Sequence, residues 1–379
     1  MTLDLSLSAP QHLLRERVRD CVARHCPPEY VRTLDEEARF PRELYAELLA
    51  GGLPGLHGAP GEGAGVAVVE LAITCEELAR TSAALALAYG TSIVAGAWAL
   101  MRYGTTEQQR SLLSQFVEGK ALFTFAATEM ATGFEAIATF ADALPDGYCL
   151  TGMEMLIPGA HVADYLLIAA RSATTAQDED ALTLFYVPRD APGLSVTPVD
   201  QMGDRALTTC AVDIAEVRVP PEALLGQRHQ GRVILGPLMG LCRLVVAAAS
   251  TGLAQGAFEQ VLAYALRSHN GARPIGDSQA VQHALAALHT RIEAARLLVY
   301  YAGWYADIGN DCAPRAAIAK QYATEAASRT VSLGMRLLGP TGNRRDCAMQ
   351  RYFRDAKPLE TAAGCAETDK DCIAGSVGL

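Results

Sequence analysis

The sequence predicts an α+β protein that is mostly α, with one β-domain in the middle of the chain. Short runs rich in Val, Ile, Leu, Tyr and Thr occur between about Leu122 and Gly226, and such runs favour strands. Long helical patterns lie on both sides of that stretch. We therefore expect an N-terminal α-helical domain over residues 1–120, a middle β-barrel domain over 121–226 and a C-terminal four-helix bundle over 227–379.

Closely spaced turn signals divide the middle stretch into short strands. Asp146-Gly147, Pro188 and Pro192-Gly193 interrupt the apolar runs, and residues of these types end strands. Short strands separated in this way are typical of a small antiparallel barrel or sandwich. The predicted strands are Phe123–Thr128, Tyr148–Thr151, Tyr165–Ala170, Leu182–Val187, Leu194–Val199 and Cys210–Val219.

Helix start and stop signals organise the first 120 residues. Pro41–Ala50 begins with proline and is followed by Gly51-Gly52, which is a typical stop. Thr105 and Gln108 form a capping box that opens a helix ending at Gly119. The other predicted helices here are Ala9–His25, Val66–Arg80 and Ser82–Tyr103.

The last third of the chain is almost continuously helical. The predicted helices are Gly231–Ser268, Asp277–Ile308, Ala313–Leu338 and a final stretch from Cys347 onward. Their apolar residues occupy more than one helix face, as in a bundle whose helices each have several neighbours. We expect part of this surface to pack against another subunit, giving a homodimer or homotetramer.

Composition excludes several classes of protein. Net charge is −10, from 42 acidic and 32 basic residues, whereas nucleic-acid binding requires a basic surface. The ten cysteines include no Cys-x-x-Cys pair, and Met1–Pro10 shows no signal-peptide pattern, so we expect free thiols and a cytoplasmic protein. The uncharged stretch between Arg80 and Arg102 is long enough to span a bilayer. Its alanines, glycines and hydroxyl residues favour a buried helix and no membrane insertion.

A series of local strings, in order along the chain, resembles the acyl-CoA dehydrogenase family. Gln201–Arg205 followed by Val217–Pro220 and Leu225-Gly226 is the most specific match. The chain is identified as a member of this family, which has a helical lobe, a β-domain and a four-helix bundle. The other matching strings are Phe125–Glu129, Arg243 with Ala247–Gly252, Arg267, Gly271, Pro274-Ile275, Gln279–Gln282, Ala319-Lys320 and Arg351–Lys357.

The resemblance implies a cofactor, a substrate and a mechanism. Family members bind FAD between the β-domain and the bundle, and an acyl thioester of CoA or a carrier protein enters from the other side. A glutamate removes the α-proton while a hydride passes to flavin N5, and an electron-transfer flavoprotein or oxygen reoxidises the flavin. Proton removal requires a placed carboxylate and a polarised thioester carbonyl. By resemblance, Thr128, Gly133, Arg267 and Gln279 contact FAD.

The sequence departs from the family at the catalytic base. Ala363 stands where the family glutamate follows the Arg-Asp-Ala-Lys string. Some members place the glutamate just before the bundle arginine, and that position is Cys242, beside Arg243. Neither position supplies a carboxylate.

The flavin side departs as well. Phe134 replaces a small hydroxyl residue that faces the pyrophosphate, and Pro158 replaces the hydroxyl residue that bonds N5. Proline has no N–H to donate. Each lost hydrogen bond is worth about 1 kcal/mol, so we expect FAD binding to be weak or absent. Further replacements are Leu156 at the aromatic ring platform, Glu154 for a lysine, Asn270 for a phenylalanine, Arg336 for a glutamine and Pro340 for a glycine.

Arg243 is the strongest candidate for a catalytic or substrate-binding residue. A cation inside an apolar helix is costly unless it is paired or solvated, so Arg243 either meets substrate or belongs to a buried ion pair. Asp204 and Arg205 lie on a loop that resembles one at the family's substrate mouth, and they are predicted to bind substrate. A solvated turn is the alternative for that loop.

The remaining candidates are open to structural explanations. Glu154, a further candidate catalytic residue, and Glu129 would face the flavin cavity, or form surface salt bridges. Glu367, one helical turn after Ala363, is a candidate for an unconventional base. Nothing in the histidine and cysteine spacing predicts a metal site. Structural roles are expected for His161, Asp164, His269, Cys242 and Cys365.

Three functions remain open. The first is an enzyme of this fold that acts on an acyl thioester by elimination, addition or cyclisation, without ordinary flavin redox chemistry, in a biosynthetic pathway such as secondary metabolism. The second is an FAD-dependent dehydrogenase or oxidase with an unconventional base. The third is a non-catalytic subunit of a heteromer with a catalytic paralogue.

Overall fold

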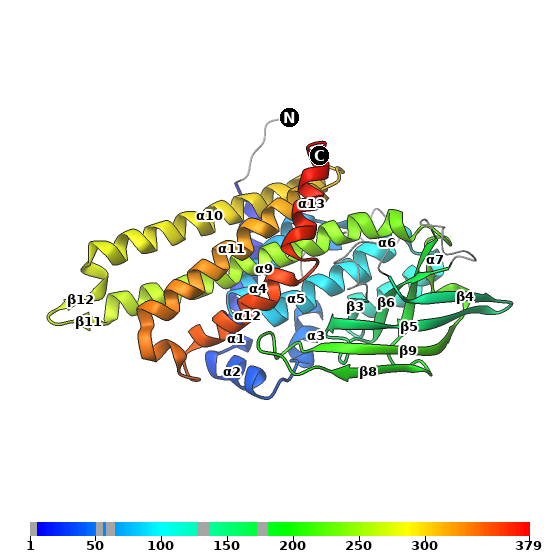
Figure 1. The fold of residues 1–379 in the computed structure, drawn as a ribbon, viewed down its shortest axis with the longest axis horizontal. Coiled ribbons are helices and arrows are strands. Elements are labelled where there is room, and N and C mark those ends of the chain that lie inside the picture. The colour runs from blue at the N-terminus through cyan, green and yellow to red at the C-terminus, as the bar shows by residue number, and fades with distance from the viewer. Residues whose placement is uncertain (1–5, 51–55, 58–64, 127–136, 173–180) are drawn as a thin grey trace.

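Helices come first along the chain, a sheet follows, and long helices complete it (Figure 1). The computed structural model describes residues 6–50, 56–57, 65–126, 137–172 and 181–379. The long helices run side by side, and the sheet lies at one end of them (Figure 1). This arrangement confirms the predicted fold class. The domain boundaries drawn from the sequence stay predictions.

Local capping fixes the first helices. The Ser8 hydroxyl accepts from the Gln11 N–H, and the Gln11 side chain accepts from the Ser8 N–H. The capping box at Thr105 and Gln108 forms as expected. The helices are α1 Ala9–His25, α2 Pro28–Glu36, α3 Arg42–Ala50, α4 Val68–Ala79, α5 Ala83–Ser92, α6 Ala99–Tyr103, α7 Thr106–Gln108 and α8 Ser114–Val117.

Two features of this region differ from the prediction. Helix α2 was not expected. The predicted single helix Ser82–Tyr103 contains a π-helical segment at Ile93–Trp98, and a second one occupies Gln109–Leu113. π-helical turns insert a residue into the helix without ending it, so the apolar pattern in the sequence does not mark them.

The middle of the chain forms an eight-stranded sheet in the order β10-β7-β6-β4-β5-β9-β8, with β3 paired to β6. Its inner side chains enclose a separate apolar core that includes Leu150, Ile168, Phe185 and Val212. The strands are β3 Phe123–Ala126, β4 Phe140–Leu144, β5 Gly147–Pro158, β6 Tyr165–Arg171, β7 Leu182–Pro188, β8 Leu194–Pro198, β9 Thr209–Val219 and β10 Leu224–Leu225.

Two strand pairings correct the antiparallel expectation, because β3 and β4 each run parallel to β6. Strand β3 runs parallel to β6, with Phe123 opposite Tyr165. Their rings stack with centroids 5.3 Å apart. The Asp164 carboxylate accepts the Leu122 N–H at 2.7 Å and holds the start of β3 beside the start of β6. The Asp164 side chain therefore helps to set the direction of β3 relative to β6. The alternation of apolar residues in the sequence cannot reveal this direction.

The C-terminal part consists of long helices that pack along one another (Figure 1). They are α9 Gly231–Arg267, α10 Gln279–Asp307, α11 Ala313–Leu338, α12 Ala348–Thr361 and α13 Ala366–Ser376. The predicted final helix from Cys347 is thus two helices. Two short hairpins complete the fold, β1 Leu56–His57 with β2 Gly65–Val66, and β11 His269–Asn270 with β12 Arg273–Pro274.

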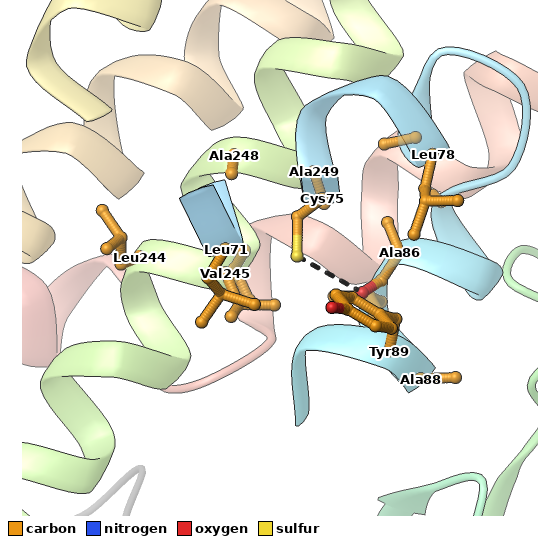
Figure 2. Close-up of a cluster of buried hydrophobic side chains, with 14 of the residues drawn as sticks. Leu71, Cys75, Leu78, Ala86, Ala88, Tyr89, Leu244, Val245, Ala248 and Ala249 are labelled. Carbon is orange, nitrogen blue, oxygen red and sulfur yellow. Dashed lines mark hydrogen bonds between the residues drawn. The ribbon is translucent and has the colours of Figure 1, made fainter. Parts of the chain in front are cut away.

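The main core lies where α9 crosses α4 and α5. Leu71 and Cys75 of α4 and Val245 of α9 meet the Tyr89 region of α5 (Figure 2). Gly90 permits this approach, because a Cβ at that position would lie 2.4 Å from Val245 Cγ1. The helices therefore pack closely enough to exclude water from the residues around Tyr89.

Two helical stretches are long and apolar enough to cross a membrane. They are Ala83–Tyr103 and Gly231–Arg267, and 83% and 78% of their most apolar windows are buried inside the protein. Core helices of a folded protein pass the same test of length and composition. Both stretches are therefore core helices, as expected for the uncharged segment between Arg80 and Arg102.

Candidate functional site

A break between α12 and α13 brings a group of buried charged residues together. The backbone turns at Ala363, with φ of 56°, and at Gly364, with φ of 109°. Glycine suits such a conformation because it has no Cβ. The turn lets α13 pack on α11. Ala363, the position of the family base, therefore lies in a partly buried loop and not on a helix.

Asp369 is the residue that this turn carries into the bundle. Its carboxylate accepts from Arg243 Nε at 2.9 Å and from Lys320 Nζ at 2.8 Å. The side chain is only 2% exposed. A buried carboxylate requires such partners, and so do the two cations. We refer to Arg243, Lys320 and Asp369 as the charge cluster.

Lys320 is the most deeply buried member of the charge cluster. Its side chain is 1% exposed, and Nζ also donates to the Gly364 carbonyl oxygen. Burial lowers the pKa of Lys320, and the hydrogen bond and charge of Asp369 oppose that effect. Lys320 thus ties the loop at Gly364 to helix α11.

Arg243 is bonded at one end of its guanidinium and open at the other. Nε donates to Asp369, while Nη1 and Nη2 have no hydrogen-bond partner among the described residues. Nη2 lies 3.7 Å from the position that a Cβ on Gly364 would take. The side chain is 13% exposed. The buried ion pair expected as one alternative is present, and the terminal nitrogens face the loop at Ala363 and Gly364.

The sequence-based list of candidates missed Asp369 and selected Glu367. Glu367 is exposed in the first turn of α13 and has no contact with Arg243 among the described residues. Hydrogen bonds at the start of the helix lower the pKa of Glu367, which weakens it as a proton acceptor. Arg243 and Lys320 inside apolar helices were the available signal, since two buried cations require an acid.

The cysteines beside the charge cluster are not activated. Burial raises the pKa of Cys242 to about 12, although the Arg243 charge acts in the opposite direction. Burial likewise raises the pKa of Cys372. Since the thiolate is the nucleophile, these thiols are poorly suited to covalent catalysis. This agrees with the structural role predicted for Cys242.

Asp204 and Arg205 lie apart from the charge cluster and connect three parts of the chain. The Asp204 N–H donates to the Asp355 carboxylate of α12 at 2.8 Å, and Asp204 is only 6% exposed. Arg205 Nε donates to the carbonyl oxygen of Asp35 in α2 at 2.9 Å. The loop is therefore neither a solvated turn nor part of the charge cluster. A charged cavity of about 600 Å³ lies beside it, lined by Asp35, Arg205 and Arg354.

A second cavity, of about 540 Å³, lies at the N-terminal part of α9. Its apolar lining includes Trp98, Met101, Pro237 and Leu241. Pro237 and Leu241 are four residues apart and share one face of α9. Arg243 follows Leu241 by two residues, so it points from a different face, toward α11 and α13. The lining of the second cavity includes no member of the charge cluster.

The histidines expected to be structural have local partners. His161 Nδ1 lies 3.4 Å from the buried Cys210 thiol, and burial lowers the pKa of His161. His269 Nδ1 lies 3.0 Å from the Arg267 carbonyl oxygen. Asp164 binds Arg42 at 2.5 Å in addition to its contact at Leu122. No group of histidine, cysteine or acidic residues suited to a metal occurs in the part of the chain that the structure describes.

Family models cover nearly the whole chain. Models described as the N-terminal, middle and C-terminal domains of acyl-CoA dehydrogenase match residues 8–120, 124–217 and 229–378. The chain belongs to the acyl-CoA dehydrogenase family. A relative in Bacillus subtilis (strain 168), "Probable acyl-CoA dehydrogenase YngJ", is 31% identical over 378 residues, covering 98% of this chain and 99% of the relative.

Solved structures of the acyl-CoA dehydrogenase family have the same fold. Glutaryl-coenzyme A dehydrogenase in its glutaryl-CoA complex superimposes with a TM-score of 0.93 at 27% identity, covering 99% of this chain and 97% of that one. The prolyl acyl carrier protein oxidase AnaB shares the fold with a TM-score of 0.91 at 23% identity, covering 99% and 100%.

Membership of the acyl-CoA dehydrogenase family implies FAD, and the described part of β5 does not fit the flavin ring. Pro158 has no N–H, and its carbonyl oxygen already accepts the Thr124 hydroxyl at 2.8 Å. Leu156, at the position of the ring platform, has φ of 63° and is 55% exposed. Glu154 pairs with Val212 through the backbone of β5 and β9. Thr128, Gly133, Glu129 and Phe134 lie outside the described residues.

The other predicted FAD contacts lie at the opposite end of the molecule. Arg267 ends α9 and Gln279 begins α10, next to the β11–β12 hairpin and far from the sheet (Figure 1). Helix α9 has 37 residues and so spans about 55 Å. Arg267 Nε donates to the Ala263 carbonyl oxygen of its own helix, and Arg267 and Gln279 are both exposed. One small molecule cannot contact β5 and Arg267 of the same chain.

Proposed function

We propose that this protein acts on an acyl thioester, carried by CoA or by a carrier protein, without hydride transfer to flavin. The reaction we propose is an elimination, addition or cyclisation next to the thioester carbonyl, in a biosynthetic pathway. The observation that supports this most is the replacement of the base by Ala363 next to the intact charge cluster. The site keeps cations that polarise a carbonyl. Elimination, addition and cyclisation need a base but no hydride acceptor, so the proton would go to a group other than residue 363.

Asp369 does not take the place of the missing base. Its carboxylate accepts hydrogen bonds from both Arg243 and Lys320, and such charge-assisted bonds favour the ionised form and hold it in place. Removing a substrate proton would require breaking one of them. We therefore assign Asp369 the role of positioning Arg243, whose terminal nitrogens would meet the substrate carbonyl.

The test is the mass of the product formed with and without flavin. The purified protein is incubated with a panel of acyl thioesters, with added FAD and an electron acceptor in one series and neither in the other. We expect the same product in both series, with the substrate mass unchanged or decreased by water. A product lighter by two hydrogens, formed only with FAD, would show that the protein is a dehydrogenase.

Variants extend this test. Arg243→Ala should abolish turnover while the protein stays folded, as judged by its circular dichroism spectrum. Ala363→Glu restores the family base, and we expect no dehydrogenase activity from it because Pro158 still supplies no donor to a flavin. Dehydrogenase activity in Ala363→Glu would show that the flavin side is competent and that only the base was lost.

A partner-subunit function is the second candidate, because Arg267 and Gln279 are exposed at the end of the bundle away from β5. These residues could complete a flavin site on a catalytic paralogue. Mixing the protein with an intact family member encoded in the same organism, followed by size-exclusion chromatography, tests this. A mixed oligomer that binds more FAD than either protein alone would favour the heteromer over the enzyme.

A further inference from the structure

The charge cluster carries an uncompensated positive charge. Arg243 and Lys320 are both cationic, and Asp369 is the only acid that bonds to either of them among the described residues. Asp311 is a further acid whose charge acts in this region, on Cys372. Asp311 is exposed, and its carboxylate accepts the Ala313 N–H at 2.9 Å. The cluster therefore has a net charge of about +1 in a largely buried place.

That charge is directed at the loop that lacks the base. Arg243 Nη2 points toward Gly364, next to Ala363. A glutamate at Ala363 would bring a second carboxylate to this loop and neutralise the cluster. With alanine the charge remains, and so does the volume that a longer side chain would fill. An unpaired buried cation is costly, so the most favourable ligand supplies the missing negative charge.

We propose that the acyl group of the substrate carries its own carboxylate, and that this carboxylate binds Arg243 Nη2 beside Ala363, which leaves Nη1 for the thioester carbonyl. The substrate class is thus a monothioester of a dicarboxylic acid. This inference rests on the proposed function, because it assumes that an acyl thioester binds at the cluster. A guanidinium has two terminal nitrogens that can donate to different oxygens, and its positive charge favours a carboxylate as one of the acceptors.

The experiment compares matched ligands that differ in one carboxylate. Pantetheine thioesters serve as probes because CoA and carrier proteins share that portion. Each dicarboxylic monothioester, from malonyl to adipoyl, is measured against the unsubstituted acyl thioester of the same carbon number by titration calorimetry. One charge-assisted bond corresponds to a preference of about ten- to a hundredfold. We expect at least one dicarboxylic ligand to show this preference.

A pair of variants tests where the charge is recognised. Ala363→Glu should remove the preference, whereas Ala363→Gln has nearly the same shape and should keep most of it. Both substitutions place the same backbone strain on a position that already carries a Cβ. Circular dichroism and melting temperature establish that each variant is folded. If Ala363→Glu does not fold, Cys242→Glu against Cys242→Gln repeats the comparison on α9.

The outcomes separate this inference from the proposed function. Equal affinity for charged and uncharged ligands would overturn the inference and leave the thioester site intact. A preference that survives in folded Ala363→Glu would also overturn it, because the carboxylate would then bind elsewhere. Binding of neither ligand series would overturn the proposed function itself, and the inference with it.

Discussion

The loop that holds Asp204 leads to a prediction about stability and pH. Burial raises the pKa of Asp204 well above its ordinary value, and the nearby charges of Asp355 and Asp35 raise it further. The Oδ1 atom of Asp204 is buried with no hydrogen-bond partner. Burial also raises the pKa of Asp355 from 3.8 to about 6. The folded protein therefore holds protons here that the unfolded chain releases.

The sign of the effect follows from the raised pKa values. A carboxyl group whose pKa is higher in the folded state stabilises the protein fully below its unfolded pKa, and that stability is lost as pH rises through the folded value. For Asp355 the free energy of unfolding falls between about pH 4 and pH 6, and the total decrease is about 3 kcal/mol. While Asp204 keeps its proton in the folded state and has lost it in the unfolded chain, the free energy of unfolding falls by a further amount of about 1.4 kcal/mol per pH unit.

Asp204→Asn should therefore stabilise the protein at neutral and higher pH. Asparagine cannot ionise, it tolerates the φ of 51° at this position, and the backbone bond to Asp355 remains. We expect a higher free energy of unfolding near pH 7 and little change near pH 4, because burial and the neighbouring carboxylates disfavour the ionised form of Asp204. Urea denaturation of both proteins between these pH values measures the difference. The control is Asp200→Asn in the same loop, where the side chain is fully exposed, at 100%.

One result would refute this reasoning. If Asp204→Asn destabilises the protein equally at all pH values, the carboxylate of Asp204 contributes a favourable interaction and not a penalty. A pH-dependent gain shared by Asp200→Asn would instead reflect general charge repulsion in the loop.

The other predictions concern packing, charge and assembly. Asp369→Ala should lower the free energy of unfolding by about 3–5 kcal/mol, because it leaves two buried cations unpaired. Arg243→Ala should lower it less, because Lys320 still bonds the Asp369 carboxylate. Thermal melting of both variants measures the order, and the reverse order would contradict the cluster geometry. Gly90→Ala should lower the melting temperature, because the new Cβ would meet Val245. Adding Val245→Ala to that variant should restore part of the melting temperature, and no recovery would show that this contact is not the cause. Light scattering at micromolar concentration should show a dimer or a dimer of dimers, and a monomer would refute the assembly. The purified protein should lack strong flavin absorbance, and stoichiometric FAD would contradict our account of Pro158.

Much of the fold could be predicted because its determinants are local. The bounds of α1 and α11 match the prediction, since caps and apolar periodicity lie within each segment. Helix α2 was missed because it is only nine residues long and begins at the second residue of Pro27-Pro28. The break after α12 was missed although Gly364 marks it. A single glycine in a helical pattern is a weak signal, and the contact that requires the turn is made by Asp369.

The candidate site was less predictable because its partners are distant in sequence. Arg243 was identified as a cation in an apolar helix, but Asp369 follows it by 126 residues. Nothing near Asp369 distinguishes it from the exposed Glu367. The burial of Asp204 was not predicted for the same reason, since its partner Asp355 lies 151 residues away. The spacing of residues along the chain reveals helix caps and apolar helix faces. It does not reveal which side chains pair when they are distant in the sequence.

The separation of the charge cluster along the chain also bears on how the protein is made. Helices α9 and α11 leave the ribosome with Arg243 and Lys320 before α13 brings Asp369, which follows Lys320 by 49 residues. Until then each cation is more stable in water than between helices. The contact of α9 with α11 at this level therefore closes last, when α13 docks. Because domains fold as they emerge, newly synthesised chains should pass through a state in which the sheet and the N-terminal helices are formed while this end of the bundle is still hydrated.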